Sequence, residues 1–211
     1  MPSESKLKRD LEFLMALEGG HVVTQMTLSR RIGVAVGLIN ALLKRAMHKG
    51  YVKARAAPYK RYAYYLTPIG FSEKSRLVAE YLESSLSFFR AARQEYGDLL
   101  TRARMSGMRR IALIGGGELA DIALMVAREV EVDVVAILDQ ETSKERLHGL
   151  VVARRPEEVP PVDGVAITDS RAPQIAFDLV RDRFEESQIL APSFLRITRA
   201  QLDFKPKLGR N

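Results

Sequence analysis

Apolar residues recur at helical spacing near the start of the chain and predict two helices there. Leucines three or four positions apart run from Leu7 to Leu17, and Gly19-Gly20 ends that pattern. A second, shorter pattern reaches Ile32. Thr24 stands in front of it as an N-cap residue, whose hydroxyl oxygen accepts a hydrogen bond from a first-turn amide.

A third helix is predicted after a tight turn at Gly33-Val34. It covers residues 35–49 and ends at Gly50, which suits the left-handed conformation beyond a helix C-terminus. A short helix, a turn that contains glycine and a longer helix are typical of the helix-turn-helix, a DNA-binding motif.

Two strand-like runs follow, at residues 51–55 and 62–66, and a basic loop over residues 57–61 joins them. A hairpin in this place forms the wing of a winged helix-turn-helix. We expect Lys60 and Arg61 at its tip, where long cationic side chains reach backbone phosphates or the minor groove.

The third helix has two faces that predict its role. Its apolar face consists of Ile39, Leu42, Leu43 and Ala46 and should pack inward. On the opposite face Asn40 can pair with adenine through two hydrogen bonds, and Lys44 can reach guanine or a phosphate. Alternatively, both are ordinary surface residues of a helical domain. The predicted DNA-binding residues are Arg30, Gly37, Asn40, Lys44, Lys53, Lys60 and Arg61.

The positive charge of the chain is concentrated in this first segment. Residues 1–66 carry twelve Lys and Arg against four Asp and Glu, a net charge of +8, although the whole chain carries only +7. A basic module on a near-neutral remainder suits binding to a polyanion, because neutralised phosphates release condensed counterions. Double-stranded DNA is therefore the predicted partner.

The winged-helix segment also resembles a known family. The run G-x-x-x-G-x-x-N begins at Gly33, K-G-Y at Lys49, and Y-x-L-T-P-x-G at Tyr64. Over roughly residues 10–85 the chain resembles MarR-like winged helix-turn-helix regulators associated with exopolysaccharide gene clusters. This resemblance implies DNA binding, transcription regulation and control of polysaccharide genes.

No proline interrupts residues 71–105, which predicts one long helix. Positions 78, 82, 85, 89, 92, 96, 99 and 103 alternate steps of four and three, and all but Ser85 are apolar or alanine. This seam fits either a contact between two copies or a helix packed on its own domain. A homodimer through the long helix suits a helix-turn-helix protein, which normally binds paired half-sites.

A buried strand at residues 111–114 runs into a glycine-rich turn and then a helical pattern. Gly115, Gly117 and Ala120 fit G-x-G-x-x-A, the pattern in which glycines and a helix start approach a phosphate. A second strand ends in Asp139, about 20 residues later, where a carboxylate accepts from ribose hydroxyls. The alternative is a loop that merely joins strand and helix. The predicted ligand-binding residues are Gly115, Gly116, Gly117, Glu118, Leu119, Ala120 and Asp139.

Further strands at residues 150–152, 165–167 and 188–190 alternate with helical segments at 156–159 and 173–184. This alternation predicts a Rossmann-like parallel sheet, so the fold class is α/β in two domains. The expected segments are a winged helix-turn-helix (1–70), a long connecting helix (71–107), a Rossmann-like domain (108–195) and a C-terminal tail (196–211).

Residues 109–195 resemble the small Rossmann-like domains found before sugar-nucleotide dehydratases and acyltransferases of polysaccharide synthesis. The likeness rests on residues 137–139, 149–152 and 191–195. The two-part layout is also similar to winged-helix-plus-Rossmann redox repressors that sense the NADH/NAD balance. These resemblances imply a nucleotide ligand, either NAD(H) or a nucleotide sugar.

Three functions compete: a ligand-responsive regulator, a DNA-binding scaffold whose Rossmann-like half only dimerises, and an enzyme. The Tyr-x-x-x-Lys dyad, the phosphate-loop lysine motif, G-x-S-x-G and H-E-x-x-H are absent. Asp139 and Asp169 each end a strand, where acids commonly touch a ligand. We expect a regulator that senses a nucleotide and is not an enzyme, with no catalytic residues.

Composition adds two expectations. The chain has no cysteine and only three scattered histidines, so we expect no metal site. No apolar run reaches the roughly 20 residues of a membrane span, and the polar start is unlike a signal peptide. The sequence therefore predicts a cytoplasmic protein without a membrane partner.

Overall fold

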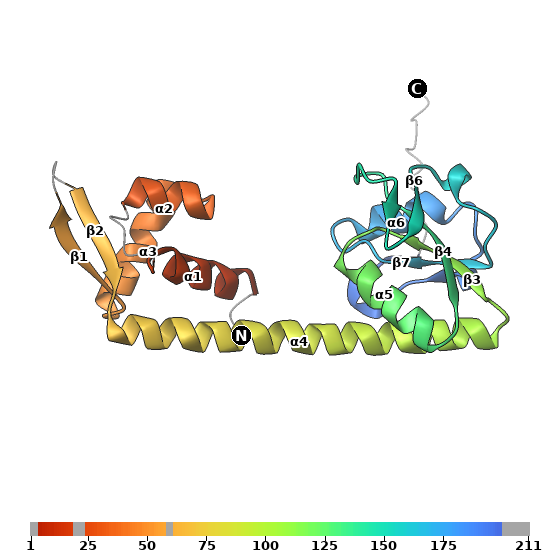
Figure 1. Ribbon diagram of the computed structural model, residues 1–211, viewed down its shortest axis with the longest axis horizontal. Helices are drawn as coiled ribbons and strands as arrows, with labels where there is room; N and C mark the ends of the chain where they lie inside the picture. The colour runs from red at the N-terminus through yellow and green to blue at the C-terminus, as the bar shows by residue number, and fades with distance from the viewer. Residues whose placement is uncertain (1–3, 19–23, 58–60, 200–211) are drawn as a thin grey trace, which may run out of the picture. The chain divides into compact units, whose positions relative to one another are not determined.

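The computed structural model describes residues 4–18, 24–57 and 61–199. The chain divides into two compact units, residues 1–87 and 88–211, and helix α4 (Pro68–Met105) belongs to both (Figure 1). Each unit has its own buried apolar core. The fold is mixed α/β with a mostly parallel sheet, as the sequence predicted.

Three helices open the first unit: α1 (Glu4–Ala16), α2 (Gln25–Ile32) and α3 (Val36–His48). The predicted N-cap of α2 is confirmed, because the Thr27 amide donates to the Thr24 hydroxyl and the Thr24 amide donates to the Thr27 hydroxyl. Gly33 and Gly50 take the left-handed conformation after α2 and α3, with φ angles of 75° and 72°.

The predicted wing is an antiparallel hairpin of β1 (Val52–Ala57) and β2 (Arg61–Leu66). Val52 pairs with Leu66 at its base, and both side chains are buried. The next residue, Lys53, is exposed, as the alternation of side chains along a strand requires. At its base the hairpin therefore has one face on the core and one in solvent, whereas further out Ala54, Ala56 and Tyr62 are exposed as well.

Thr67 and Gly70 join the wing to α4. The Thr67 hydroxyl donates to the Gly50 carbonyl at 2.6 Å, and its oxygen accepts from the Gly70 amide at 3.1 Å. A Cβ atom on Gly70 would lie 2.0 Å from the carbonyl oxygen of Tyr51, so only glycine lets the helix start this close to the hairpin. These contacts account for the L-T-P-x-G run in the sequence.

The two halves of α4 have different surroundings. Leu77 is buried in the core of the first unit, and Tyr96 is buried in the core of the second. Between them Leu82 and Phe89 are exposed. The second half of the predicted seam therefore packs mainly on its own domain, since Ala92, Tyr96 and Ala103 are all buried there.

The second unit is built on a six-stranded sheet with the order β5-β6-β4-β3-β7-β8. All neighbouring strands are parallel except β5 and β6. Strands β6, β4, β3, β7 and β8 thus follow the Rossmann-like order. The strands are β3 (Arg110–Ile114), β4 (Asp133–Leu138), β5 (Arg146–Leu147), β6 (Leu150–Ala153), β7 (Gly164–Ile167) and β8 (Ile189–Leu190).

Helices cover both faces of this sheet (Figure 1). Helix α5 (Glu118–Glu129) and the second half of α4 share one apolar cluster with the sheet, and α6 (Pro173–Val180) shares the other. Three 3₁₀ turns complete the unit: η1 (Pro156–Glu158), η2 (Glu186–Gln188) and η3 (Ser193–Leu195). The sheet is therefore the middle of three layers.

One local prediction needs correction, and one crossover has an unusual form. The helix expected over residues 173–184 ends at Val180, because a turn over residues 181–183 follows it. The crossover from β4 to β6 contains no α-helix. It contains β5, which pairs with β6 around His148 and Gly149, both in the left-handed conformation.

Candidate nucleic-acid interface and ligand cleft

The basic face of the first unit comes from a long segment without acids. Between residues 19 and 72 the sequence holds nine Lys and Arg residues and no Asp or Glu. This segment supplies α2, α3 and both strands of the wing. A polyanion that approaches these elements meets no like charge from them.

The pattern of buried and exposed side chains along α3 agrees with its two predicted faces. Ile39, Leu42, Leu43 and Ala46 are buried, Gly37 and Lys44 are exposed, and Asn40 is half-buried. Arg30 on α2 and Lys53 on β1 are also exposed. Lys60 lies outside the described residues, and only the backbone of Arg61, at the start of β2, is described.

Among the described residues, most basic side chains on this face have no acidic partner. Arg45 forms an ion pair with Asp10 at 2.6 Å, and Arg31 donates to the carbonyl of Ala16. Within the described part of the chain, ion pairs are absent at Arg30, Lys44, Lys53 and Arg55. Their charges remain available to an external anion.

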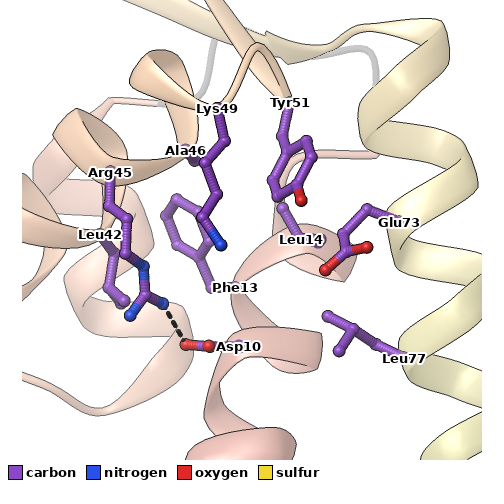
Figure 2. Close-up of a pocket in the computed structure, with 10 residues that line it drawn as sticks. All are labelled: Asp10, Phe13, Leu14, Leu42, Arg45, Ala46, Lys49, Tyr51, Glu73 and Leu77. Carbon is purple, nitrogen blue, oxygen red and sulfur yellow. Dashed lines mark hydrogen bonds and ion pairs between the residues drawn. The ribbon is translucent and has the colours of Figure 1, made fainter.

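A small cavity lies behind α3, between α1 and the start of α4 (Figure 2). Its volume is about 40 Å³, which holds a water molecule or two but no larger ligand. Arg45 and Asp10 form their ion pair at its edge, and Lys49 and Glu73 also line it. Hydrogen bonds from Arg76 lower the pKa of Glu73 against the opposing effect of burial, and the charges of Arg76 and Lys49 add to the lowering.

A larger cleft lies in the second unit, where β3, β4 and β7 end. It has a volume of about 430 Å³ and sits between β3 and β7, where the strand order reverses. This is the position in which open α/β sheets bind ligands. The cleft is lined by Gly115, Gly116, Gly117, Glu118, Asp139, Thr168, Asp169, Ser170 and Arg171.

The glycine-rich loop is held tightly against the neighbouring strand. Gly115 has a φ of 108°, and a Cβ atom there would lie 2.6 Å from the amide nitrogen of Asp169. The buried Thr168 hydroxyl donates to the Gly115 carbonyl at 2.6 Å. Gly117 precedes α5 and has nothing within 4 Å of the place of a Cβ atom, so this side of the loop is open.

Asp139 binds the loop directly. One carboxylate oxygen accepts from the Gly116 amide at 2.8 Å, and the other accepts from the amides of Glu141 and Thr142 at 2.9 and 3.0 Å. Burial raises the pKa of Asp139, but the three amide hydrogen bonds and the charge of Arg171 outweigh it, so the pKa lies below its usual value. The carboxylate is thus held in its charged form beside the loop.

The charged residues that line the cleft are mainly acids. Glu118, Asp139 and Asp169 face one cation, Arg171, which forms an ion pair with Glu141 at 2.9 Å. Asp169 accepts from the amides of Arg171 and Ala172 at 2.7 and 2.9 Å. A bound pyrophosphate would meet like charge here, whereas a neutral or positively charged ligand would not.

The structure brings together five of the seven residues predicted for the ligand. Leu119 and Ala120 instead are buried in the core beneath α5 and do not line the cleft. The third small residue of the pattern lets the helix pack closely on the sheet, which is what Ala120 does. Thr168, Ser170 and Arg171 were missed, although the polar run T-D-S-R directly after a buried strand marks such a loop.

Two further features concern the described residues only. No group of three or more His, Asp or Glu side chains there could hold a metal ion. No single helix there is both long and apolar enough to cross a membrane, and only the bent pair of α2 and α3 passes that test, by length and composition.

No protein-family model matches the chain, nor does any curated protein. Solved structures do match. The chain resembles MepR, a transcription regulator of the Staphylococcus aureus multidrug efflux pump MepA, with 15% identity and a TM-score of 0.36 over 40% of this chain and 69% of that one. It also resembles RosA from Streptomyces davawensis, an N,N-8-amino-8-demethyl-D-riboflavin dimethyltransferase, with 12% identity and a TM-score of 0.35 over 89% of this chain and 77% of that one.

A third match is the O-methyltransferase NcsB1 from neocarzinostatin biosynthesis, in complex with S-adenosylmethionine. Its identity is 11% and its TM-score 0.38, over 90% of this chain and 79% of that one. These values describe what the chain is similar to and assign it no activity.

The comparisons contradict the prediction that the chain is not an enzyme. RosA and NcsB1 are methyltransferases, and NcsB1 holds S-adenosylmethionine. The motifs missing from the sequence belong to enzymes whose own side chains or phosphate loops carry the chemistry. Where a cofactor supplies the reactive group, the protein mainly binds and orients it. The missing motifs therefore do not exclude an enzyme.

Proposed function

We propose that the chain is a DNA-binding transcription regulator of the MarR-like winged-helix type, whose Rossmann-like unit binds a nucleoside-containing ligand. One observation carries the DNA-binding part: the acid-free segment 19–72, with exposed Arg30, Lys44 and Lys53 and no ion pairs at these side chains in the described structure. Such a face gains free energy from the counterions that leave neutralised phosphates.

The ligand is expected in the cleft at Gly115–Gly117 and Asp139. A carboxylate about 20 residues after the glycines suits the hydroxyls of a ribose. The other acids, Glu118 and Asp169, disfavour a pyrophosphate. The charge of the cleft therefore ranks S-adenosylmethionine, whose positive sulfonium and ammonium groups outweigh its carboxylate, ahead of NAD(H) and a nucleotide sugar.

A second candidate function is a transferase that uses a positively charged nucleoside cofactor. The acidic lining of the cleft favours it, because such a cofactor carries its own reactive group and the protein need only bind and orient it. Consumption of the cofactor in the presence of DNA or another acceptor separates this candidate from a regulator that only binds the ligand.

Two features of the regulator follow from the same proposal. Exposed Leu82, Leu86 and Phe89 on α4 support a homodimer whose contact uses this part of the helix. The resemblance to exopolysaccharide-associated regulators makes polysaccharide genes the expected targets, and a DNA-binding role carries with it the expected cytoplasmic location.

The test measures binding of the full chain to a pool of labelled DNA duplexes at low salt, with and without each of the three ligands. Gly117→Val places a side chain into open space at the cleft, so we expect it to fold, to bind DNA like the parent and to lose any ligand response. A parent protein that ignores duplexes at low salt overturns the regulator. A variant that responds like the parent overturns the ligand site, and a ligand-free scaffold then becomes the better explanation.

A further inference from the structure

An apolar groove opens beside the predicted DNA-binding face. It lies between the starts of α2 and α3 and strand β2, with a volume of about 610 Å³. Met26, Val36 and Tyr62 line it and are 55%, 37% and 60% exposed. At its base the Gln25 side chain donates to the Tyr64 hydroxyl at 3.2 Å. Adjoining apolar side chains left in solvent mark an interaction surface.

The first turn of α3 carries a second exposed aliphatic side chain, which does not line the groove itself. Leu38 is also 37% exposed, and with Val36 it flanks Gly37. A Cβ atom on Gly37 would meet nothing within 4 Å, and its φ lies outside the left-handed region, so the fold does not require glycine there. The first turn therefore presents two aliphatic side chains and no bulky group between them.

Charge identifies the occupant of this surface. Arg30 stands one turn after Met26 on α2, and Lys44 two turns after Gly37 on α3. Neither is in an ion pair within the described ranges, and the segment 19–72 that forms the groove has no acid. An apolar strip bordered by unpaired cations complements a DNA major groove, where phosphates flank the base edges.

We propose that Val36 and Leu38 read thymine through its C5-methyl group, so that the preferred duplex carries thymines under the first turn of α3. This inference rests on the proposed binding of double-stranded DNA. The thymine methyl is the apolar group on the major-groove base edges, and a recognition helix contacts those edges with its N-terminal residues. Asn40, one turn further on, is placed to read an adjacent adenine in the same groove.

The test first selects a preferred duplex from a random pool with the full chain, and then replaces its thymines by uracil. This exchange removes only the methyl group. We expect the dissociation constant to rise about fourfold for each contacted thymine, the equivalent of one methyl-sized group left unburied. Equal affinity for the thymine and uracil duplexes overturns the inference and leaves DNA binding intact.

Variants then assign the effect to residues. In the double variant Val36→Ala and Leu38→Ala, the dissociation constant for the uracil duplex divided by that for the thymine duplex should fall toward one. Met47→Ala is the matched control, because Met47 is also 37% exposed but lies at the other end of α3, so its ratio should stay that of the parent. A double variant that keeps the parent ratio overturns the assignment. A parent that binds no duplex overturns both proposals, and leaves a protein partner to be sought for the groove.

Discussion

The hydroxyl of Tyr96 donates a hydrogen bond to the main-chain carbonyl of Ile167 at 2.8 Å, and both residues are fully buried. Tyr96 belongs to the second half of α4, and Ile167 ends β7 directly before Thr168, which lines the cleft. The bond therefore ties α4 to one wall of the cleft. Burial and then the charge of Glu95 raise the pKa of Tyr96, so the hydroxyl stays a neutral donor.

Tyr96→Phe should lower the free energy of unfolding of the second unit by about 1–2 kcal/mol, because it leaves the buried Ile167 carbonyl without this donor. The ring itself stays, so its edge-on contact with Phe194 at 6.3 Å is retained. Denaturant unfolding measures the change. The control is Tyr65→Phe, an exposed tyrosine without a hydroxyl hydrogen bond among the described residues. Equal stability of parent and Tyr96→Phe would contradict the role of this bond.

The two outer glycines of the loop should respond differently to the same change. Gly115→Ala places a methyl group 2.6 Å from the Asp169 backbone at a φ of 108°, so we expect a loss of about 1–3 kcal/mol or more. Gly117→Ala meets nothing within 4 Å and should unfold like the parent. Thermal unfolding of both variants tests this, and similar losses in both would show that the loop is not held as described.

Sequence periodicity predicted most elements because their signals are local. Thr24 and Gly33 bound α2 through contacts within a few residues, and Gly115 and Gly117 stand directly between a strand and a helix. Which other element a side chain packs against is not set by its near neighbours in the sequence. The seam of α4 was apolar throughout, but its repeat did not reveal that Tyr96 packs on its own sheet while Leu82 remains exposed.

The cleft was predicted only on one side for the same reason. Gly116 and Asp139 follow a motif with a fixed spacing, whereas Thr168 and Arg171 join them only because β7 pairs with β3. That pairing joins strands about fifty residues apart and has no signature in the chain. The bond between Asp139 and the Gly116 amide likewise depends on how two loops meet.

Lowering the pH should reduce the free energy of unfolding of the second unit, partly through protonation of Asp139. Its pKa is lowered in the folded state, so its contribution to stability is fully present above the unfolded value of about 3.9 and is lost as the pH falls through the folded value. Asp139→Asn removes the acceptor of the Gly116 amide at every pH. The stability gap between parent and variant should therefore be larger at pH 7 than at acid pH.

Asp133→Asn provides the control for this pH experiment. Asp133 is exposed at the other end of β4, and its carboxylate accepts no hydrogen bond within the described ranges. Unfolding followed from neutral to acid pH should give parallel curves for this variant and the parent. A gap for Asp139→Asn that stays constant with pH would mean that its carboxylate does not supply the acid sensitivity.

Phosphate contacts should appear in the salt dependence of DNA binding. Removing Lys44 or Lys53 should weaken binding to all duplexes and flatten the slope of log affinity against log salt by about one unit per lost contact. Arg128→Ala removes an exposed cation from α5 and should leave the slope unchanged. An unchanged slope for Lys44→Ala would remove that side chain from the interface.

Gly37→Leu should weaken DNA binding without lowering the stability of the fold. A Cβ atom at Gly37 meets nothing within 4 Å on the outward face of α3, so we expect the new side chain to leave the packing intact. Because leucine is a better helix former than glycine, we expect the free energy of unfolding to stay equal or to rise by up to about 1 kcal/mol. The same side chain keeps the helix backbone away from the base edges, so affinity for the preferred duplex should fall at least tenfold. Fluorescence anisotropy at fixed salt measures the affinity, and a variant that binds as tightly as the parent would place the DNA on another face.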